Sequence, residues 1–133
     1  MYHFTTKIHG KSFEEAIEHV TAELKKEGFG IITKIDMKSA LKEKINVDFR
    51  NYTILGACNP KYAYQAILEE DKIGVFLPCN VVVQENAEGT IEISAVDPVA
   101  SMMAVENKAL IDAATSIQTK LKLVIDRLTA PAL

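Results

Sequence analysis

The sequence lacks several features that mark particular classes of protein. It has only two cysteines in 133 residues, too few for the disulfide frameworks of small secreted domains, so both thiols are expected to be reduced. No apolar run approaches the roughly 20 residues that cross a bilayer, and the first residues contain no apolar stretch typical of a signal peptide. These absences predict a cytoplasmic protein without a membrane partner.

The chain also lacks a basic excess and the familiar catalytic motifs. Its formal net charge is −3, so it does not have the positive field that gives nucleic-acid-binding proteins their affinity, and no nucleic-acid partner is expected. Phosphate-binding glycine loops, zinc-protease, C-x-x-C and serine-hydrolase motifs are all absent. Because zinc usually takes four protein ligands, two cysteines alone predict no metal site, and no cofactor follows from the sequence.

What is present predicts one folded domain over residues 1–133. Hydrophobic residues make up 48% of the chain and charged residues 25%, as in ordinary globular proteins. Alternation and helical periodicity predict strands near residues 2–8, 29–35, 52–58, 73–77, 79–85 and 90–96, and helices near residues 13–27, 37–45, 60–68, 98–104 and 108–128. This order indicates an α+β fold, a two-layer α/β sandwich whose mixed sheet of about five strands has helices packed mainly on one face.

Three helices have apolar faces that are expected to be buried. The predicted faces are Met37, Ala40, Leu41 and Ile45 in the second helix, Ala63, Tyr64, Ile67 and Leu68 in the third, and Leu110, Ala114, Ile117, Leu121, Val124 and Leu128 in the last. The last set repeats every seven residues over fewer than three heptads, which favours docking on the sheet. The alternative is a dimer formed through this helix.

A repeated Cys-Asn pair is the most distinctive feature of the sequence. Cys58 and Asn59 end a predicted strand before Pro60, and Cys79 and Asn80 follow 21 residues later. If the two strand ends are neighbours, two thiols and two carboxamides converge near a helix N-terminus, where an anion or a thiolate is favoured. Burial of the cysteines and capping by Asn59 explain the same residues without any chemistry.

Three further residues are candidates for the same polar site. Asp97 precedes Pro98, and this spacing is also typical of a residue that only caps a helix. Lys34 and Asp36 lie at a predicted strand end, where α/β domains often carry binding residues. A solvated ion pair between these two side chains explains them equally well.

Several of these segments together resemble a known family. The segments are residues 28–36, 54–60, 77–83 and 97–98, which contain both Cys-Asn pairs and the Asp97-Pro98 pair. In their combination they resemble the uncharacterised bacterial and archaeal family called domain of unknown function 302, over nearly the whole chain. The resemblance implies a small two-layer α/β fold, typically found as a dimer, with no established activity.

Three classes of function remain open at this point. A homodimeric binding module would hold a small molecule or anion near the Cys-Asn pairs. A thiol-dependent enzyme or redox protein would use Cys58 or Cys79 as its nucleophile and the other cysteine as a resolving thiol. A structural or interaction protein would self-associate and have no site at all.

Overall fold

A computed structural model describes residues 1–129 and has an α+β fold. The strands are His3–Ile8 (β1), Gly30–Asp36 (β2), Tyr52–Cys58 (β3), Cys79–Glu85 (β4) and Ile91–Val96 (β5). The α-helices are Phe13–Lys26 (α1), Met37–Ile45 (α2), Pro60–Glu69 (α3), Pro98–Met102 (α4) and Lys108–Leu128 (α5), and short 3-10 turns span Ile73–Phe76 and Met103–Val105. None of the helices in residues 1–129 has the length and apolar character needed to cross a membrane.

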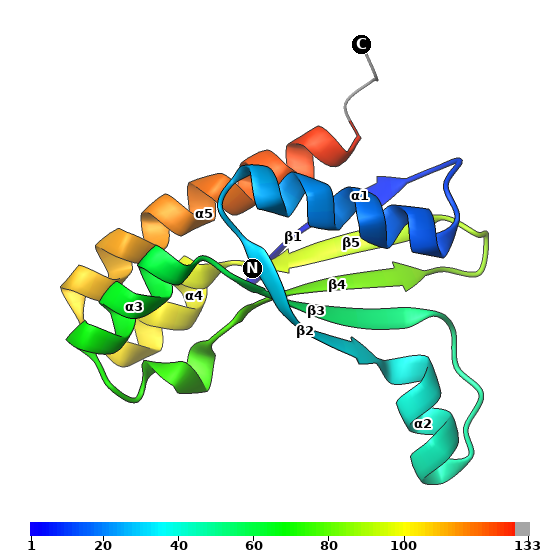
Figure 1. Cartoon of the computed structure of the whole chain (residues 1–133), viewed down its shortest axis with the longest axis horizontal. Helices are drawn as coiled ribbons and strands as arrows, with labels where there is room; N and C mark the ends of the chain where they lie inside the picture. Colours follow the sequence, from blue (N-terminus) through cyan, green and yellow to red (C-terminus); the bar gives the residue numbers. More distant parts are fainter. Residues whose placement is uncertain (130–133) are drawn as a thin grey trace.

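The five strands form one sheet in the order β1-β5-β4-β3-β2, and every pairing is antiparallel. The expectation of a mixed sheet is therefore wrong. A parallel pair needs a connection that runs back along the whole face of the sheet. Figure 1 shows α2 and α3 beyond the ends of the strands, so the chain reverses direction at each of them and the next strand pairs antiparallel.

Two long helices cover one face of this sheet, as predicted. In Figure 1, α1 and α5 lie side by side over the same face. Val81 and Val83 in β4 are opposite Ala95 and Ile93 in β5, and all four side chains are buried beneath the helices. The six predicted seam residues of α5 are all buried within the chain, so the seam docks on the core and is not available for a dimer contact.

Three predictions about local packing are wrong. Residues 73–77 were expected to be extended, yet Ile73–Phe76 forms a 3-10 turn that buries only Ile73. The predicted face of α2 buries none of its side chains within the described chain. In α3 the buried side chains are Tyr62 and Ala66, while Tyr64, Ile67 and Leu68 are exposed. These apolar faces exist but are not used by the core of their own chain.

Candidate functional site

The fold brings the two cysteines to one end of the sheet. Strands β3 and β4 are direct neighbours, and Cys79 at the start of β4 is opposite Ala57, the residue before Cys58. Cys58 is half-buried, Cys79 is buried, and neither forms a disulfide. The condition that the two strand ends be neighbours is therefore met.

Both cysteines line one cavity of about 250 Å³. The residues around it come from β2, β3, α3, the turn after α3 and β4: Ile32, Ala57, Cys58, Asn59, Tyr62, Ala63, Ile67, Gly74, Leu77, Pro78 and Cys79. No lysine, arginine or histidine belongs to this set of described residues. The lining is mostly apolar, in contrast to the polar site expected from the Cys-Asn pairs.

Tyr62 is a polar residue in the wall of the cavity. Its side chain is 8% exposed, and its hydroxyl is buried without a hydrogen-bond partner among residues 1–129. Burial and, to a smaller extent, the nearby Cys79 thiol together raise the pKa of Tyr62 to about 12. The phenol is therefore neutral at physiological pH, with an O–H group that can donate a hydrogen bond.

The Cys79 thiol is also kept neutral. Burial and, to a smaller extent, the neighbouring Cys58 thiol together raise the pKa of Cys79 to about 11. Since the thiolate is the reactive form of cysteine, Cys79 is a weak nucleophile at neutral pH. At this cavity the Cys79 thiol behaves as a small, polarisable apolar group that packs well against uncharged molecules.

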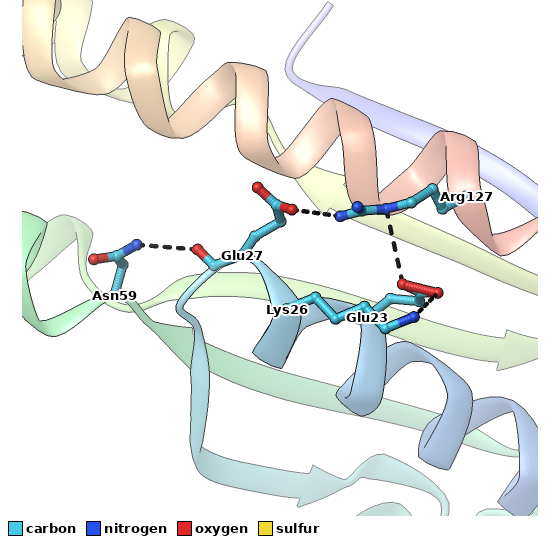
Figure 2. A network of polar contacts seen from close by, with 5 residues as sticks. All are labelled: Glu23, Lys26, Glu27, Asn59 and Arg127. Atoms are coloured by element: carbon cyan, nitrogen blue, oxygen red, sulfur yellow. Dashed lines mark hydrogen bonds and ion pairs between the residues drawn. The ribbon is translucent and has the colours of Figure 1, made fainter.

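Asn59 joins the cavity to the end of α1. It is the N-cap of α3, where its Oδ1 accepts a 3.5 Å hydrogen bond from the backbone N–H of Tyr62. Its Nδ2 donates a 3.4 Å hydrogen bond to the carbonyl oxygen of Glu27, as Figure 2 shows. The carboxamide is thus occupied by structural contacts, as the capping explanation predicts.

An ion-pair cluster fixes that end of α1 against α5 (Figure 2). Arg127 Nη2 is 2.7 Å from Glu27 Oε2, and Arg127 Nε is 3.8 Å from Glu23 Oε2. Lys26 Nζ lies 3.0 Å from the other carboxylate oxygen of Glu23. This cluster positions the Glu27 backbone that Asn59 contacts. Its members are Glu23, Lys26, Glu27 and Arg127.

Asn80 does not join the cavity. It follows the buried Cys79 in β4, so its side chain points to the opposite, open face of the sheet. There it borders a separate depression of about 380 Å³, together with Tyr2, His3, Tyr52, Val82, Gln84, Glu92, Ser94, Ala95 and Val96. Only one of the two predicted carboxamides, that of Asn59, lies beside the thiols.

The three other predicted site residues also lie elsewhere. Asp97 caps α4, and its Oδ1 accepts hydrogen bonds of 3.0 Å from Val99 N and from Gln118 Nε2 of α5. Asp36 caps α2 by accepting from Ser39, and these hydrogen bonds lower the pKa of its carboxyl group. Lys34 is exposed on β2, and no ion pair joins it to Asp36 in the described part of the chain.

An open groove on the other side of Asn59 holds the basic residues of this region. It measures about 790 Å³, and Lys26, Lys61 and Lys120 line it with Asn59 and Tyr62. An anion near the Cys-Asn pairs would meet these lysines in the groove and not in the thiol cavity. Elsewhere in residues 1–129, no group of three or more His, Cys, Asp or Glu side chains is placed to hold a metal ion.

Comparison with known proteins is consistent with this fold and places the chain in a family. The family model described as a domain of unknown function, DUF302, matches residues 4–128. The chain belongs to the DUF302 family. It is also similar to a solved structure titled as the uncharacterized conserved protein DUF302 from Bacillus stearothermophilus, with 32% identity and a TM-score of 0.87. That match covers 96% of this chain and 98% of the other, and none of the curated proteins compared with the chain matches it.

Proposed function

We propose that this DUF302 chain is a homodimeric binding module that holds a small, largely apolar molecule in the thiol cavity. One observation carries the ligand part of the proposal, namely the buried Tyr62 hydroxyl without a partner in residues 1–129. Leaving a buried hydroxyl unpaired costs about 1–3 kcal/mol. A ligand carbonyl or hydroxyl oxygen that accepts from Tyr62 would remove this cost once the ring turns its hydroxyl toward the cavity.

The size and lining of the cavity define the ligand class. Its volume of about 250 Å³ is just below the roughly 300–1,000 Å³ of typical ligand pockets, so the ligand is small. The apolar lining and the neutral Cys79 thiol favour an uncharged molecule over an anion. The proposed ligand is a compact hydrocarbon body with one hydrogen-bond acceptor.

The alternatives have weaker support. A thiol enzyme needs a nucleophile of lowered pKa, whereas the pKa of Cys79 is raised to about 11. Cys58 is the more accessible of the two thiols, since it is half-buried and Cys79 is buried. A purely structural protein would gain stability by filling the cavity and pairing the tyrosine hydroxyl.

Titration with cyclohexanone, a small apolar ketone, tests the ligand class. We expect Tyr62→Phe to weaken binding about 5-fold, because one hydrogen bond is lost, and to stabilise the unliganded protein by about 1 kcal/mol. Ala63→Phe fills the cavity and should abolish binding. Ala113→Phe is the matched control, since Ala113 is also half-buried but borders only the lysine groove.

Ligand-observed NMR and thermal unfolding provide the two readouts. Binding that is equal in the wild type and in Ala63→Phe would rule out this cavity as the binding site. Inorganic phosphate is the second probe. Phosphate binding that depends on Lys61 and Lys120, with no cyclohexanone binding, would transfer the function to the open groove.

A further inference from the structure

Helix α2 is a largely exposed element, in which Met37, Ala40 and Leu41 are half-buried and the other residues are exposed. It stands away from the body on the loop between β2 and β3 (Figure 1), and it buries no side chain within the described residues. Nine-residue helices are marginal in water unless an apolar face packs on something. Residues 35–47, here called the arm, carry Ile35, Met37, Ala40, Leu41, Ile45 and Val47. Ile45 is 63% exposed.

A second exposed apolar surface lies beside the thiol cavity. It consists of Tyr64, Ile67, Leu68, Val75 and Phe76, and is here called the rim patch. The first three residues share one face of α3 at spacings of three and four, and α3 packs against the turn that holds the other two. Ile67 also lines the cavity, so the patch continues into its mouth.

The two surfaces have complementary charge. The arm carries Lys38, Lys42 and Lys44 against Asp36 and Glu43, whereas the end of α3 beside the rim patch carries Glu69, Glu70 and Asp71 against Lys72. Within one chain the surfaces cannot meet, because α2 and α3 lie at opposite ends of the sheet (Figure 1). A contact between the two surfaces therefore requires a second copy of the chain.

We infer that the arm of each protomer docks on the rim patch of the other and closes the thiol cavity. A two-fold axis makes the contact reciprocal, so one association covers both arms and both patches. The partner's arm would lie against Ile67 at the mouth of the cavity and exclude water from it. This inference rests on the homodimer of the proposed function and names its interface.

Two single substitutions test the contact by light scattering. Ile45→Asp changes the arm and Leu68→Asp changes the rim patch, and both side chains are more than 60% exposed in the single chain, at 63% and 62%. We expect each variant to fold and to raise the dimer dissociation constant by about 30-fold or more. Leu123→Asp, on the exposed side of α5, is the control and should remain dimeric.

Mixing the two variants is the decisive step. In an equimolar mixture, the intact arm of the Leu68→Asp chain meets the intact patch of the Ile45→Asp chain. One contact of two is restored, so the mixture should dimerise more tightly than either variant alone. Arm-to-arm or patch-to-patch contacts predict no such recovery, and its absence would overturn the inference, as would a monomeric wild type.

Charge reversal provides a second test if either aspartate variant unfolds. Lys44→Glu and Glu70→Lys should each weaken the dimer, and the chain carrying both should recover. Alkylation reports cavity closure, since Cys58 should react faster in monomeric Ile45→Asp than in the wild type. An unchanged rate would refute closure. A wild-type dimer that does not bind cyclohexanone would refute the ligand proposal and leave the interface intact.

Discussion

Replacing Arg127 with alanine is expected to lower the free energy of unfolding by about 3 kcal/mol. Its guanidinium group pairs with Glu27 at 2.7 Å and lies 3.8 Å from Glu23 Oε2. The side chains of Glu23 and Glu27 are only 10% and 16% exposed, so removing the arginine leaves two largely buried carboxylates with less compensation. Arg127 itself is 36% exposed, so solvent screens part of the interaction and the expected loss of stability is at the low end for a buried pair.

Urea denaturation measures this effect, with Lys72→Ala as the control. Lys72 pairs with Asp71 at 3.4 Å, but both side chains are at least 80% exposed, at 84% and 80%. Its removal should change stability by less than about 0.5 kcal/mol. Equal losses in the two variants would mean that burial of the cluster has no energetic consequence. Arg127→Ala should also loosen the Glu27 backbone that Asn59 contacts, and so weaken cyclohexanone binding.

Gly56→Ala is the second change with a large expected effect, a loss of about 2–3 kcal/mol. A Cβ at Gly56 would overlap Thr33 Oγ1 in β2 and lie 2.8 Å from Pro78 Cγ. Both neighbours belong to ordered segments at the end of the sheet that forms the cavity. Relief of the overlap would therefore move β2 or the Pro78 segment and change the cavity wall.

A second strand glycine provides the matched control. Gly30 is in β2, and a Cβ built there meets nothing within 4 Å, so Gly30→Ala should be nearly neutral. Adding Thr33→Ala to Gly56→Ala should restore part of the lost stability, because the hydroxyl that overlaps the new methyl group is gone. Thermal unfolding of the wild type, Gly56→Ala, Thr33→Ala and the double variant gives the coupling. Independent, additive effects of Gly56→Ala and Thr33→Ala would contradict the proposed clash.

The sequence predicts an element well when its periodicity and end signals agree. The bounds of α5 match the prediction at both ends, since a 21-residue helix carries a full apolar stripe. Ser12 and Glu15 form a capping box at the start of α1, and this spacing can be read from the sequence. Apolar and polar residues alternate along β4 and β5, and the apolar positions form the buried face of the sheet. The register of the two strands must keep these positions on one face, because a slip of one residue would move them into solvent.

Periodicity fails to identify which surface an apolar face contacts. The arm and the exposed side of α3 have helical apolar patterns, but these faces are not part of their own chain's core. A helical apolar pattern indicates an amphipathic face without showing what that face contacts. Tyr62 was not among the residues predicted to be buried in the third helix, for the same reason. Tyr62 lies three residues after the cap residue Asn59 and four before Ala66, and this helical spacing is the signal that it shares the buried face of Ala66.

The composition of the site was predicted only in part. Cys58, Asn59 and Cys79 converge because β3 and β4 are neighbours, as their shared motif indicated. Asn80 lies on the other face, since consecutive strand residues alternate. Asp97 and Asp36 are helix caps, and capping accounts for both residues without further chemistry. The apolar character of the cavity depends on residues from five segments and follows only from the fold.

Alkylation of the native protein with iodoacetamide, with and without saturating cyclohexanone, tests the central claim most directly. Mass spectrometry of the peptides reports Cys58 and Cys79 separately. A ligand in the thiol cavity predicts slow labelling of Cys58 that cyclohexanone slows further, and no labelling of Cys79 until the protein unfolds, because Cys79 is buried with a pKa of about 11. Rapid and equal labelling of both cysteines, unaffected by cyclohexanone, would contradict the shared site.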